Sequence, residues 1–277
     1  MYIDCHVHFW KPSRGDYGWL KPENELLFKD YLPEQLLPEL GAFGVNGLVA
    51  VQAAVSAEEA VFLLELAQTW PVISGVCGGL DPFGDLFHEQ LELLKANPRF
   101  TGIRLSGSAF RSERSEAERN KLRSAFAALM QADLTLDLLV QPGDLSAVAS
   151  YLEEMPQLKS VVNHLGCPDI REQRQETWLI GMKRLAQLPG VAVKLSGMIT
   201  MAGGFHPERL RPYIDPLVQL FGSDRLLFGS DWPVALQAGG YRDVIDLFEA
   251  VFPDDLAEEE KGKIRAGNAS RFYPILS

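Results

Sequence analysis

The chain has 277 residues, of which 47% are hydrophobic and 23% charged, and it carries a net charge of −11. This is the composition of a globular protein, and the negative charge argues against nucleic acid or an anionic membrane surface as a partner, because both are bound through basic patches. Apolar runs stay shorter than the roughly 18 residues of a membrane span, and no charged leader precedes an apolar segment, so we expect neither a membrane protein nor secretion.

The cysteine content indicates the compartment. Cys5, Cys77 and Cys167 are odd in number, lie far apart in the sequence and form no CxxC motif. A disulfide framework and a cysteine-based zinc site are therefore not expected, and the pattern is typical of the reducing cytoplasm.

The first element is a short apolar strand over residues 3–10, which runs into the motif His6-Val7-His8. Alternate residues of a strand point to the same side, so His6 and His8 are expected to project together near its end. Two imidazoles in this arrangement form a site for a metal, a proton or a polarised carbonyl.

Residues 11–32 read as a loop punctuated by proline and glycine. A loop of this length is often functional, and Asp16, Tyr17 and Trp19 are candidates for lining a polar ligand site. The alternative for the two aromatic residues is that Tyr17 and Trp19 only cover the core or the mouth of the fold.

Seven further apolar segments follow, most of them separated by helical patterns such as those over 57–69 and 116–132. Strands that alternate with helices predict a parallel sheet, and their continuous apolar runs fit strands buried on both faces. Eight such units in about 250 residues predict an α/β fold of the (β/α)8 barrel type, and with no linker we expect one domain over 1–277. An open doubly wound sheet is the alternative, although no GxGxxG or GxxxxGK[ST] motif follows a strand. The seven segments are 47–52, 72–78, 101–105, 134–140, 159–164, 191–197 and 225–231.

Polar residues stand near the carboxyl ends of these strands, where a barrel places its active site. Besides His6 and His8, they are Arg104, His164 and Asp231, so three of the five histidines fall there. Each of the last three also has a structural explanation: a pair with a structural carboxylate for Arg104, a hydrogen-bonded core position for His164, and a turn or helix cap for Asp231. Their joint occurrence favours a catalytic site.

With these motifs in place, the chain resembles the amidohydrolase superfamily, and within it the sugar-lactonase branch of L-fuconolactonase-like and L-rhamnonolactonase-like enzymes. The resemblance spans nearly the whole chain and is specific for the branch, not for a substrate. The segments that carry it are 3–10, 51–53, 102–104, 163–166, 194–197, 228–233 and 267–269.

The resemblance implies that His6, His8 and Asp231 form the metal-binding or catalytic set, with His164 beside them. Many metal-dependent members add a strand-four lysine or glutamate, or a strand-five histidine. Here strand four offers Arg104 and strand five ends in Gln141. We therefore expect at most one divalent cation, such as Zn2+, and the branch also contains members that work without a metal.

The residue types then suggest hydrolysis of a sugar-acid lactone. Asp231 is assigned as the proton shuttle, and His6 and His8 are expected to polarise the carbonyl directly or through Zn2+. His164 is expected to stabilise the oxyanion or orient the water. The residues assigned to substrate binding are Arg104, Gln52, Trp19 and Trp232.

Three alternatives remain at this stage. A dicarboxylate lactonase requires further cations, and Arg111 and Arg114 are read as solvated loop residues. A zinc-dependent decarboxylase of the same superfamily lacks a clear strand-five ligand here. A non-catalytic sugar-binding protein has no need of all four polar residues. The expected partner is a small sugar lactone, and the oligomeric state is left open.

Overall fold

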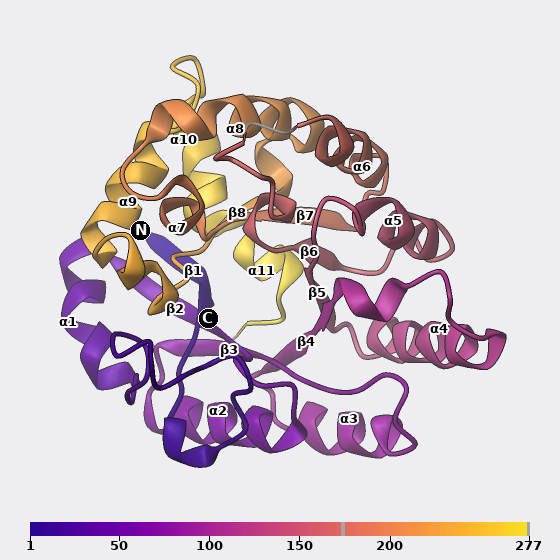
Figure 1. Cartoon of the computed structure of the whole chain (residues 1–277). Helices are drawn as coiled ribbons and strands as arrows, with labels where there is room; N and C mark the ends of the chain where they lie inside the picture. The colour runs from indigo at the N-terminus through magenta and orange to yellow at the C-terminus, as the bar shows by residue number, and fades with distance from the viewer. Residues whose placement is uncertain (173–174, 276–277) are drawn as a thin grey trace.

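The computed structural model describes residues 1–172 and 175–275. Eight parallel strands lie side by side in sequence order, from β1 to β8, and helices surround them (Figure 1). Every strand is almost entirely buried, which explains their continuous apolar sequences. The strands are β1 (Tyr2–Val7), β2 (Val45–Val51), β3 (Ile73–Gly78), β4 (Phe100–Ser106), β5 (Thr135–Leu139), β6 (Ser160–Val162), β7 (Val191–Leu195) and β8 (Leu226–Phe228).

The barrel closes where the end of β1 meets the segment after β8. The Asp231 N–H donates to the His6 carbonyl at 2.8 Å, and the His8 N–H donates to the Trp232 carbonyl at 2.7 Å. Val7 and Trp232 form a parallel bridge at the same place. The predicted (β/α)8 barrel is therefore confirmed, and its closure places the first and last strand ends next to each other.

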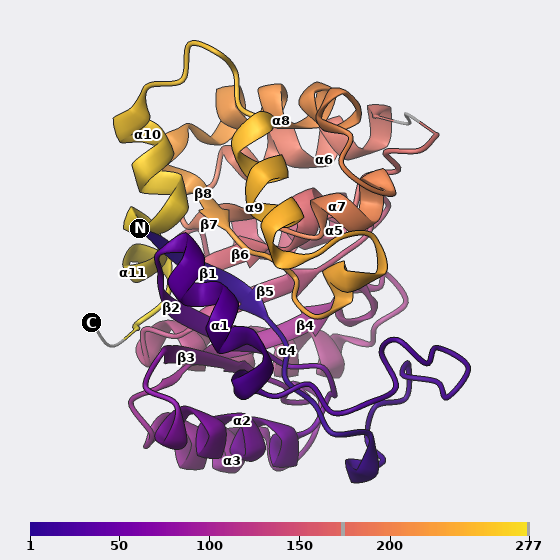
Figure 2. The same ribbon diagram turned by 90° about the vertical axis from the view of Figure 1, so that its left-hand side faces the viewer.

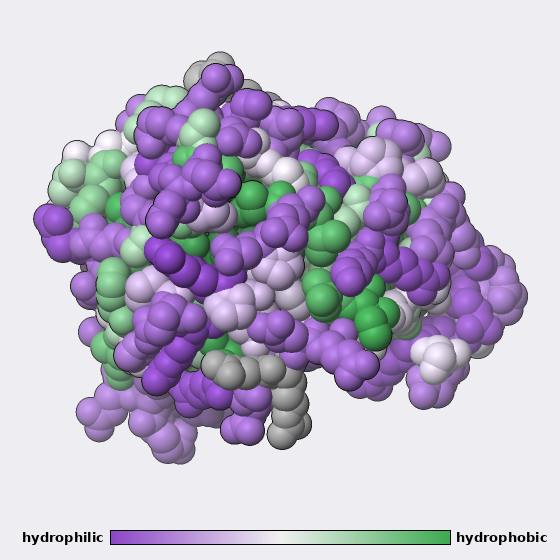
Figure 3. Space-filling view, turned by 90° about the horizontal axis from the view of Figure 1, so that it is seen from above, coloured by the Kyte–Doolittle hydropathy of each residue, from purple (hydrophilic) through white to green (hydrophobic). Residues whose placement is uncertain are grey.

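The helices cover the outside of the barrel, and their starts follow local sequence signals. Ser56 accepts a hydrogen bond from the Glu59 N–H, and Ser115 with Glu118 forms a capping box. The outer face in Figure 3 is mostly hydrophilic with scattered hydrophobic residues. The helices are α1 (Pro33–Phe43), α2 (Ala57–Thr69), α3 (Phe87–Lys95), α4 (Glu116–Gln131), α5 (Leu145–Glu153), α6 (Glu176–Ala186), α7 (Met198–Ala202), α8 (Pro207–Phe221), α9 (Tyr241–Ala250), α10 (Glu258–Gly262) and α11 (Ala269–Phe272).

The strands β6 and β8 are shorter than the sequence pattern predicts. Each has three residues, and the polar residues that follow leave the extended conformation. His164 has φ 51° and Asp231 has φ 63°, in the left-handed region. Both side chains therefore come from turns just beyond the strand ends.

The C-terminal segment closes the floor of the barrel. In Figure 2, α11 lies on the side opposite the loop over residues 11–32. Tyr273 is fully buried, and its hydroxyl donates to Asp137 of β5 at 2.5 Å. Asn268 donates from Nδ2 to the Ser223 and Leu226 carbonyls at 2.7 and 2.8 Å. This end holds the base of the strands, and the opposite end is left for the site.

We expect Asn268→Ala to lower the free energy of unfolding by about 1–3 kcal/mol, because it leaves buried carbonyl acceptors unpaired. Denaturant unfolding measures the change. The control is Asn120→Ala on exposed α4, where an effect within about 0.5 kcal/mol is expected. Equal effects of the two variants would contradict the structural role given to Asn268.

Two further expectations concern the whole chain. Cys5, Cys77 and Cys167 are free thiols, as their spacing predicts. Within the described residues, none of the helices has the length and apolar character needed to cross a membrane.

Candidate active site

The paired histidines at the end of β1 face each other, as the strand period predicts. Their Nε2 atoms are 3.2 Å apart. The Nδ1 of His8 lies 2.7 Å from the Val51 carbonyl, which can only accept, so Nδ1 carries the proton. The Nε2 of His8 therefore presents a lone pair toward His6 and Asp231 when the ring is neutral.

Asp231 reaches the same point from the turn after β8. Its Oδ1 lies 3.4 Å from Nε2 of His8 and 3.7 Å from Nε2 of His6. Burial on its own raises the pKa of Asp231, but His164, His8 and Arg104 together outweigh burial and hold that pKa below its usual value. Asp231 is therefore a carboxylate at neutral pH.

Asp4 positions both sides of this cluster, although the sequence motifs do not single it out as a site residue. Its Oδ1 accepts from the Ser230 N–H at 2.8 Å and from the His6 N–H at 3.1 Å, and its Oδ2 accepts from the Tyr241 hydroxyl at 2.9 Å. Burial raises the pKa of Asp4 to about 6, although these hydrogen bonds oppose the rise. The available signal was an acidic residue inside an otherwise apolar strand.

His164 enters the cluster from the turn after β6. Its ring centroid is 4.5 Å from that of His6. The Ser196 hydroxyl accepts from the His164 backbone N–H at 3.2 Å and lies 2.9 Å from Nδ1. When that hydroxyl donates to Nδ1, the ring proton stays on Nε2. Burial lowers the pKa of His164 to about 4, so the ring is neutral at pH 7.

Arg104 of β4 is buried and lines the same cavity as His8, His164 and Asp231. Its Nη2 donates to the Gln52 carbonyl at 2.5 Å. Its Nε and the Oε1 of Gln52 are buried without a hydrogen-bond partner within the described part of the chain. Buried unpaired groups are costly, so Arg104 and Gln52 retain capacity for a polar ligand.

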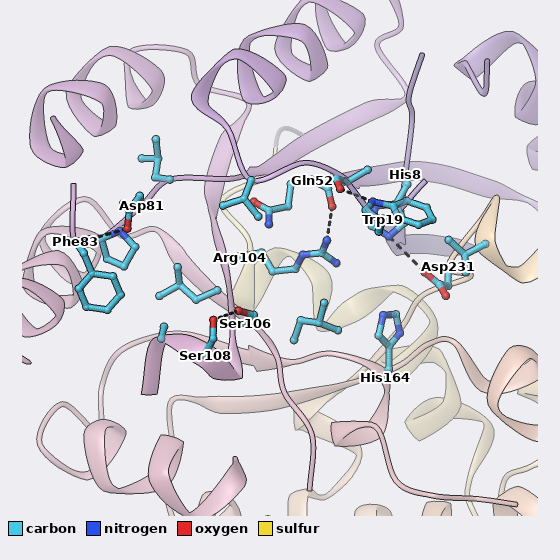
Figure 4. Close-up of a pocket in the computed structure, with 18 of the residues that line it drawn as sticks. His8, Trp19, Gln52, Asp81, Phe83, Arg104, Ser106, Ser108, His164 and Asp231 are labelled. Atoms are coloured by element: carbon cyan, nitrogen blue, oxygen red, sulfur yellow. Dashed lines mark hydrogen bonds and ion pairs between the residues drawn. The ribbon is translucent and has the colours of Figure 1, made fainter. Parts of the chain in front are cut away.

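These side chains open into a cavity of 740 Å³, large enough for a small polyhydroxylated ligand (Figure 4). Trp19 from the long loop covers one side and is anchored by its Nε1, which donates to the Ala53 carbonyl at 2.7 Å. The predicted residues that line this cavity are His8, Trp19, Gln52, Arg104, His164 and Asp231.

Trp232 does not line this cavity, contrary to its predicted role in substrate binding. It is buried, and its ring packs against Phe9 and Tyr31 at centroid distances of 5.9 and 5.3 Å. Asp231 lies in the left-handed region, with φ 63°, so the alternation of the strand does not continue through it. Trp232 lies in the aromatic layer outside the cavity, where it lines a second, smaller pocket.

The three candidates in the long loop, Asp16, Tyr17 and Trp19, occupy different environments. Tyr17 is buried as a core residue, and Asp16 pairs with Arg14 at 2.7 Å, so only Trp19 of the three loop candidates reaches the cavity. Arg114 lines the cavity and stacks 3.9 Å over the Phe83 ring. Arg114, interpreted from the sequence as a solvated loop residue, is thus partly exposed at the edge of the cavity, and its Nη1 pairs with Glu118 at 2.6 Å.

His6, His8 and Asp231 also fit a metal. Their ligand atoms all lie within 4.8 Å of one another. Tetrahedral zinc with metal–nitrogen distances of about 2.0–2.1 Å needs ligand atoms about 3.3 Å apart, and the three observed distances are 3.2, 3.4 and 3.7 Å. The Nδ1 of His164 is engaged by Ser196, and Arg104 cannot ligate. The donor set therefore suits one ion.

Comparison with known proteins places this geometry in a family. The amidohydrolase family model matches residues 3–275. The chain belongs to the amidohydrolase family. The resemblance inferred from the sequence motifs is thus confirmed over the whole barrel.

Several known proteins match this chain over nearly their whole length. L-fucono-1,5-lactonase from Burkholderia ambifaria is 32% identical, with 99% of this chain and 95% of the relative covered. L-fucono-1,5-lactonase from Burkholderia multivorans is 33% identical, with 99% and 96% covered. A crystal structure of an amidohydrolase from Burkholderia multivorans with bound zinc is 30% identical, has a TM-score of 0.88 and covers both chains completely.

Proposed function

We propose that this protein is a hydrolase that opens the ring of a sugar-acid lactone, of the L-fucono-1,5-lactone type, by attack of water on the carbonyl. The observation that carries the proposal is the contact of the Asp231 carboxylate with His8, beside neutral His164, in one cavity. The full-length relatives named L-fucono-1,5-lactonase support the substrate class.

Asp231 acts as the proton shuttle. A carboxylate with a pKa held below its usual value is ionised at pH 7 and can accept a proton from water. The attack forms a tetrahedral intermediate, and its collapse breaks the bond to the ring oxygen. Asp231 then returns the proton to the departing alkoxide, which leaves a hydroxy acid.

His164 stabilises the oxyanion. A neutral imidazole that receives a hydrogen bond from Ser196 at Nδ1 offers its Nε2 proton to the cavity. A donor fixed in this position before the reaction favours the charge that develops on the carbonyl oxygen. His8 completes the polar wall on the side of Asp231, and His6 lies fully buried behind it, with its Nε2 3.2 Å from that of His8.

A divalent cation would be held by His6, His8 and Asp231, and zinc fits this donor set. When bound, it would supply Lewis-acid polarisation of the carbonyl. The steps assigned to Asp231 and His164 use the side chains alone.

Arg104, Gln52 and Trp19 bind the sugar ring. The unpaired Nε of Arg104 and amide of Gln52 suit hydroxyl groups, and the indole of Trp19 offers an apolar face at the mouth. We expect Arg104→Met to raise KM about tenfold or more with a smaller change in kcat, because one charged hydrogen bond contributes about 1.5–3 kcal/mol. Steady-state kinetics measure this, with Arg211→Met on exposed α8 as the control. A loss confined to kcat would contradict a binding role.

Arg114 supports a second candidate, a lactone that carries a carboxylate. It lines the same cavity as Arg104, with its Nη1 paired with Glu118 at 2.6 Å, so an anionic substrate would meet a second guanidinium group that it shares with Glu118. Decarboxylation has no such observation in its favour. The donor set of His6, His8 and Asp231 would serve hydrolysis and decarboxylation equally.

The experiment is a pH-indicator assay with a panel of aldonolactones and dicarboxylate lactones, run before and after removal of metal by chelation. We expect acid release from one stereochemical series of sugar-acid lactones. A parallel measurement of carbon dioxide separates decarboxylation from hydrolysis. Acid release from dicarboxylate lactones alone would select the second candidate, and binding without turnover would contradict both.

The pH dependence follows from the two pKa directions. The pKa of Asp231 is lowered and that of His164 is about 4, so both groups keep their active protonation states from neutral pH downward until about pH 4. We expect Asp231 and His164 to leave kcat/KM constant from about pH 7 to 5 and to cause a fall only below about 4, so a partial step near pH 6 would come from Asp4. Circular dichroism at each pH controls for acid unfolding. A loss of most activity between about pH 7 and 5 would contradict the assignment to Asp231 and His164.

The cellular setting is part of the proposal. Three free cysteines fit a reducing compartment such as the cytoplasm. The negative net charge fits a small-molecule substrate better than nucleic acid. We take residues 1–277 as one domain.

A further inference from the structure

A buried ion pair lies directly behind the paired histidines, and the proposed reaction does not use it. Lys194 of β7 and Asp137 of β5 are fully buried, with Nζ and Oδ2 2.5 Å apart. Asp137 also accepts from Tyr273 and Asn163. The Nζ of Lys194 lies 3.5 Å from Nδ1 of His6, so a cation stands on the side of His6 that faces away from Asp231.

The donors and acceptors of Lys194, His6, His8 and Val51 determine which ring nitrogen of His6 carries the proton. An ammonium group only donates, so Nδ1 of His6 must accept when Lys194 approaches it. His6 then carries its proton on Nε2, 3.2 Å from Nε2 of His8. That atom of His8 accepts, because the proton of His8 is on Nδ1 and points to Val51. The hydrogen bonds thus run in one direction, from Lys194 through His6 and His8 to Val51.

The contact with Lys194 also limits how many protons His6 can carry. Because Nδ1 of His6 lies 3.5 Å from an ammonium donor and must accept, the ring has its single proton on Nε2. A proton on Nδ1 would face the ammonium donor and would leave two lone pairs, those of the two Nε2 atoms, in contact at 3.2 Å.

We propose that Lys194 is a positioning residue that sets the tautomer of His6 and so weakens metal binding at His6, His8 and Asp231. A metal needs the Nε2 lone pair of both histidines, and on His6 that position carries the proton. A metal-binding histidine usually donates its other ring N–H to an acceptor. His8 has such an acceptor in Val51, whereas His6 has a donor.

The inference goes beyond the proposed lactonase activity and does not depend on it. The zinc-bound relative with a TM-score of 0.88 indicates that such a barrel can hold the ion. In this chain, binding requires the His6 proton to move and the contact with Lys194 to be lost. The two imidazoles therefore form a complete hydrogen-bonded pair on their own.

The first test reads the tautomer in the wild-type protein. Nitrogen-15 NMR of histidine-labelled, metal-free protein separates protonated from unprotonated ring nitrogens, and the chain has only five histidines to assign. The missing signals of His6→Gln identify His6. We expect an unprotonated Nδ1 and a protonated Nε2 on His6 near pH 7. A protonated Nδ1 would overturn the proposal.

The second test measures Zn2+ affinity by equilibrium dialysis. Lys194→Met alone would leave the charge of Asp137 buried and unpaired, so the variant is Lys194→Met with Asp137→Asn, which leaves the net charge unchanged. We expect it to bind Zn2+ about 10- to 100-fold more tightly than the wild type, the usual size of effects from partners of metal-binding residues. The matched control is Lys159→Met with Asp133→Asn, which removes a more exposed ion pair.

Unchanged Zn2+ affinity in the folded Lys194 variant would overturn the proposal, as would an equal gain in the control. If the buried double variant does not fold, the NMR measurement on the wild type decides the question. Neither test uses catalytic activity, so failure here leaves the lactonase proposal intact.

Discussion

Asp231→Asn is expected to lower kcat on the accepted lactone by about 100- to 10,000-fold, the range supplied by a positioned general base. The amide cannot take a proton from water, but it is nearly isosteric with the carboxylate. Asparagine also tolerates the left-handed backbone of residue 231, which has φ 63°. The fold is therefore expected to survive the change, so that the decrease in kcat can be attributed to the missing carboxylate.

Steady-state rates of acid release measure this effect, with Asp224→Asn as the control because Asp224 is an exposed aspartate before β8. The melting temperature of each variant is checked in parallel. Retention of full turnover by Asp231→Asn would show that another group moves the proton. A loss that follows unfolding would say nothing of the role, and the melting temperature identifies that case.

His164→Asn is expected to lower kcat by about 100- to 1000-fold, the usual cost of removing one oxyanion donor. The shorter side chain withdraws the donor from the cavity, and asparagine again suits the backbone, which has φ 51°. KM is expected to change much less than kcat, because the interaction strengthens only as charge develops on the carbonyl oxygen.

The control for His164 is His88→Asn, on the exposed surface of α3. A raised KM with kcat unchanged would assign His164 to ground-state binding. An unchanged kcat would remove it from the mechanism. Because Ser196 orients the ring, Ser196→Ala is expected to give a smaller decrease of the same kind.

The barrel and the core of the site could be predicted because both follow from local patterns. Continuous apolar runs fix buried parallel strands, and the two-residue period puts His6 and His8 on one side. Strand ends of a barrel meet at one face, which brings His164 and Asp231 to the same cavity. The position of Trp232 outside this cavity could not be predicted in this way, because the chain has left the extended conformation at Asp231, which has φ 63°.

The partners behind the site could not be predicted in the same way. Asp4, Asp137 and Lys194 are charged residues inside apolar strands, and the sequence marks them as unusual. Their partners come from distant strands, so the pairing of Lys194 with Asp137 and its approach to His6 depend on barrel closure and register. The direction of the hydrogen bonds from Lys194 through His6 to His8 depends on these contacts between strands. This direction in turn affects metal binding.

The most direct measurement of the proposed chemistry is a single turnover of L-fucono-1,5-lactone in 18O-labelled water, with enzyme in excess over substrate. Attack of water activated by Asp231 on the carbonyl predicts one 18O atom in the carboxylate of the first product, and none in its new hydroxyl group or in the enzyme. Mass spectrometry of the product and of the peptide that contains Asp231 reads all three positions. Label in Asp231 with an unlabelled product would identify the carboxylate as a nucleophile, and absence of any acid release would contradict the lactonase assignment itself.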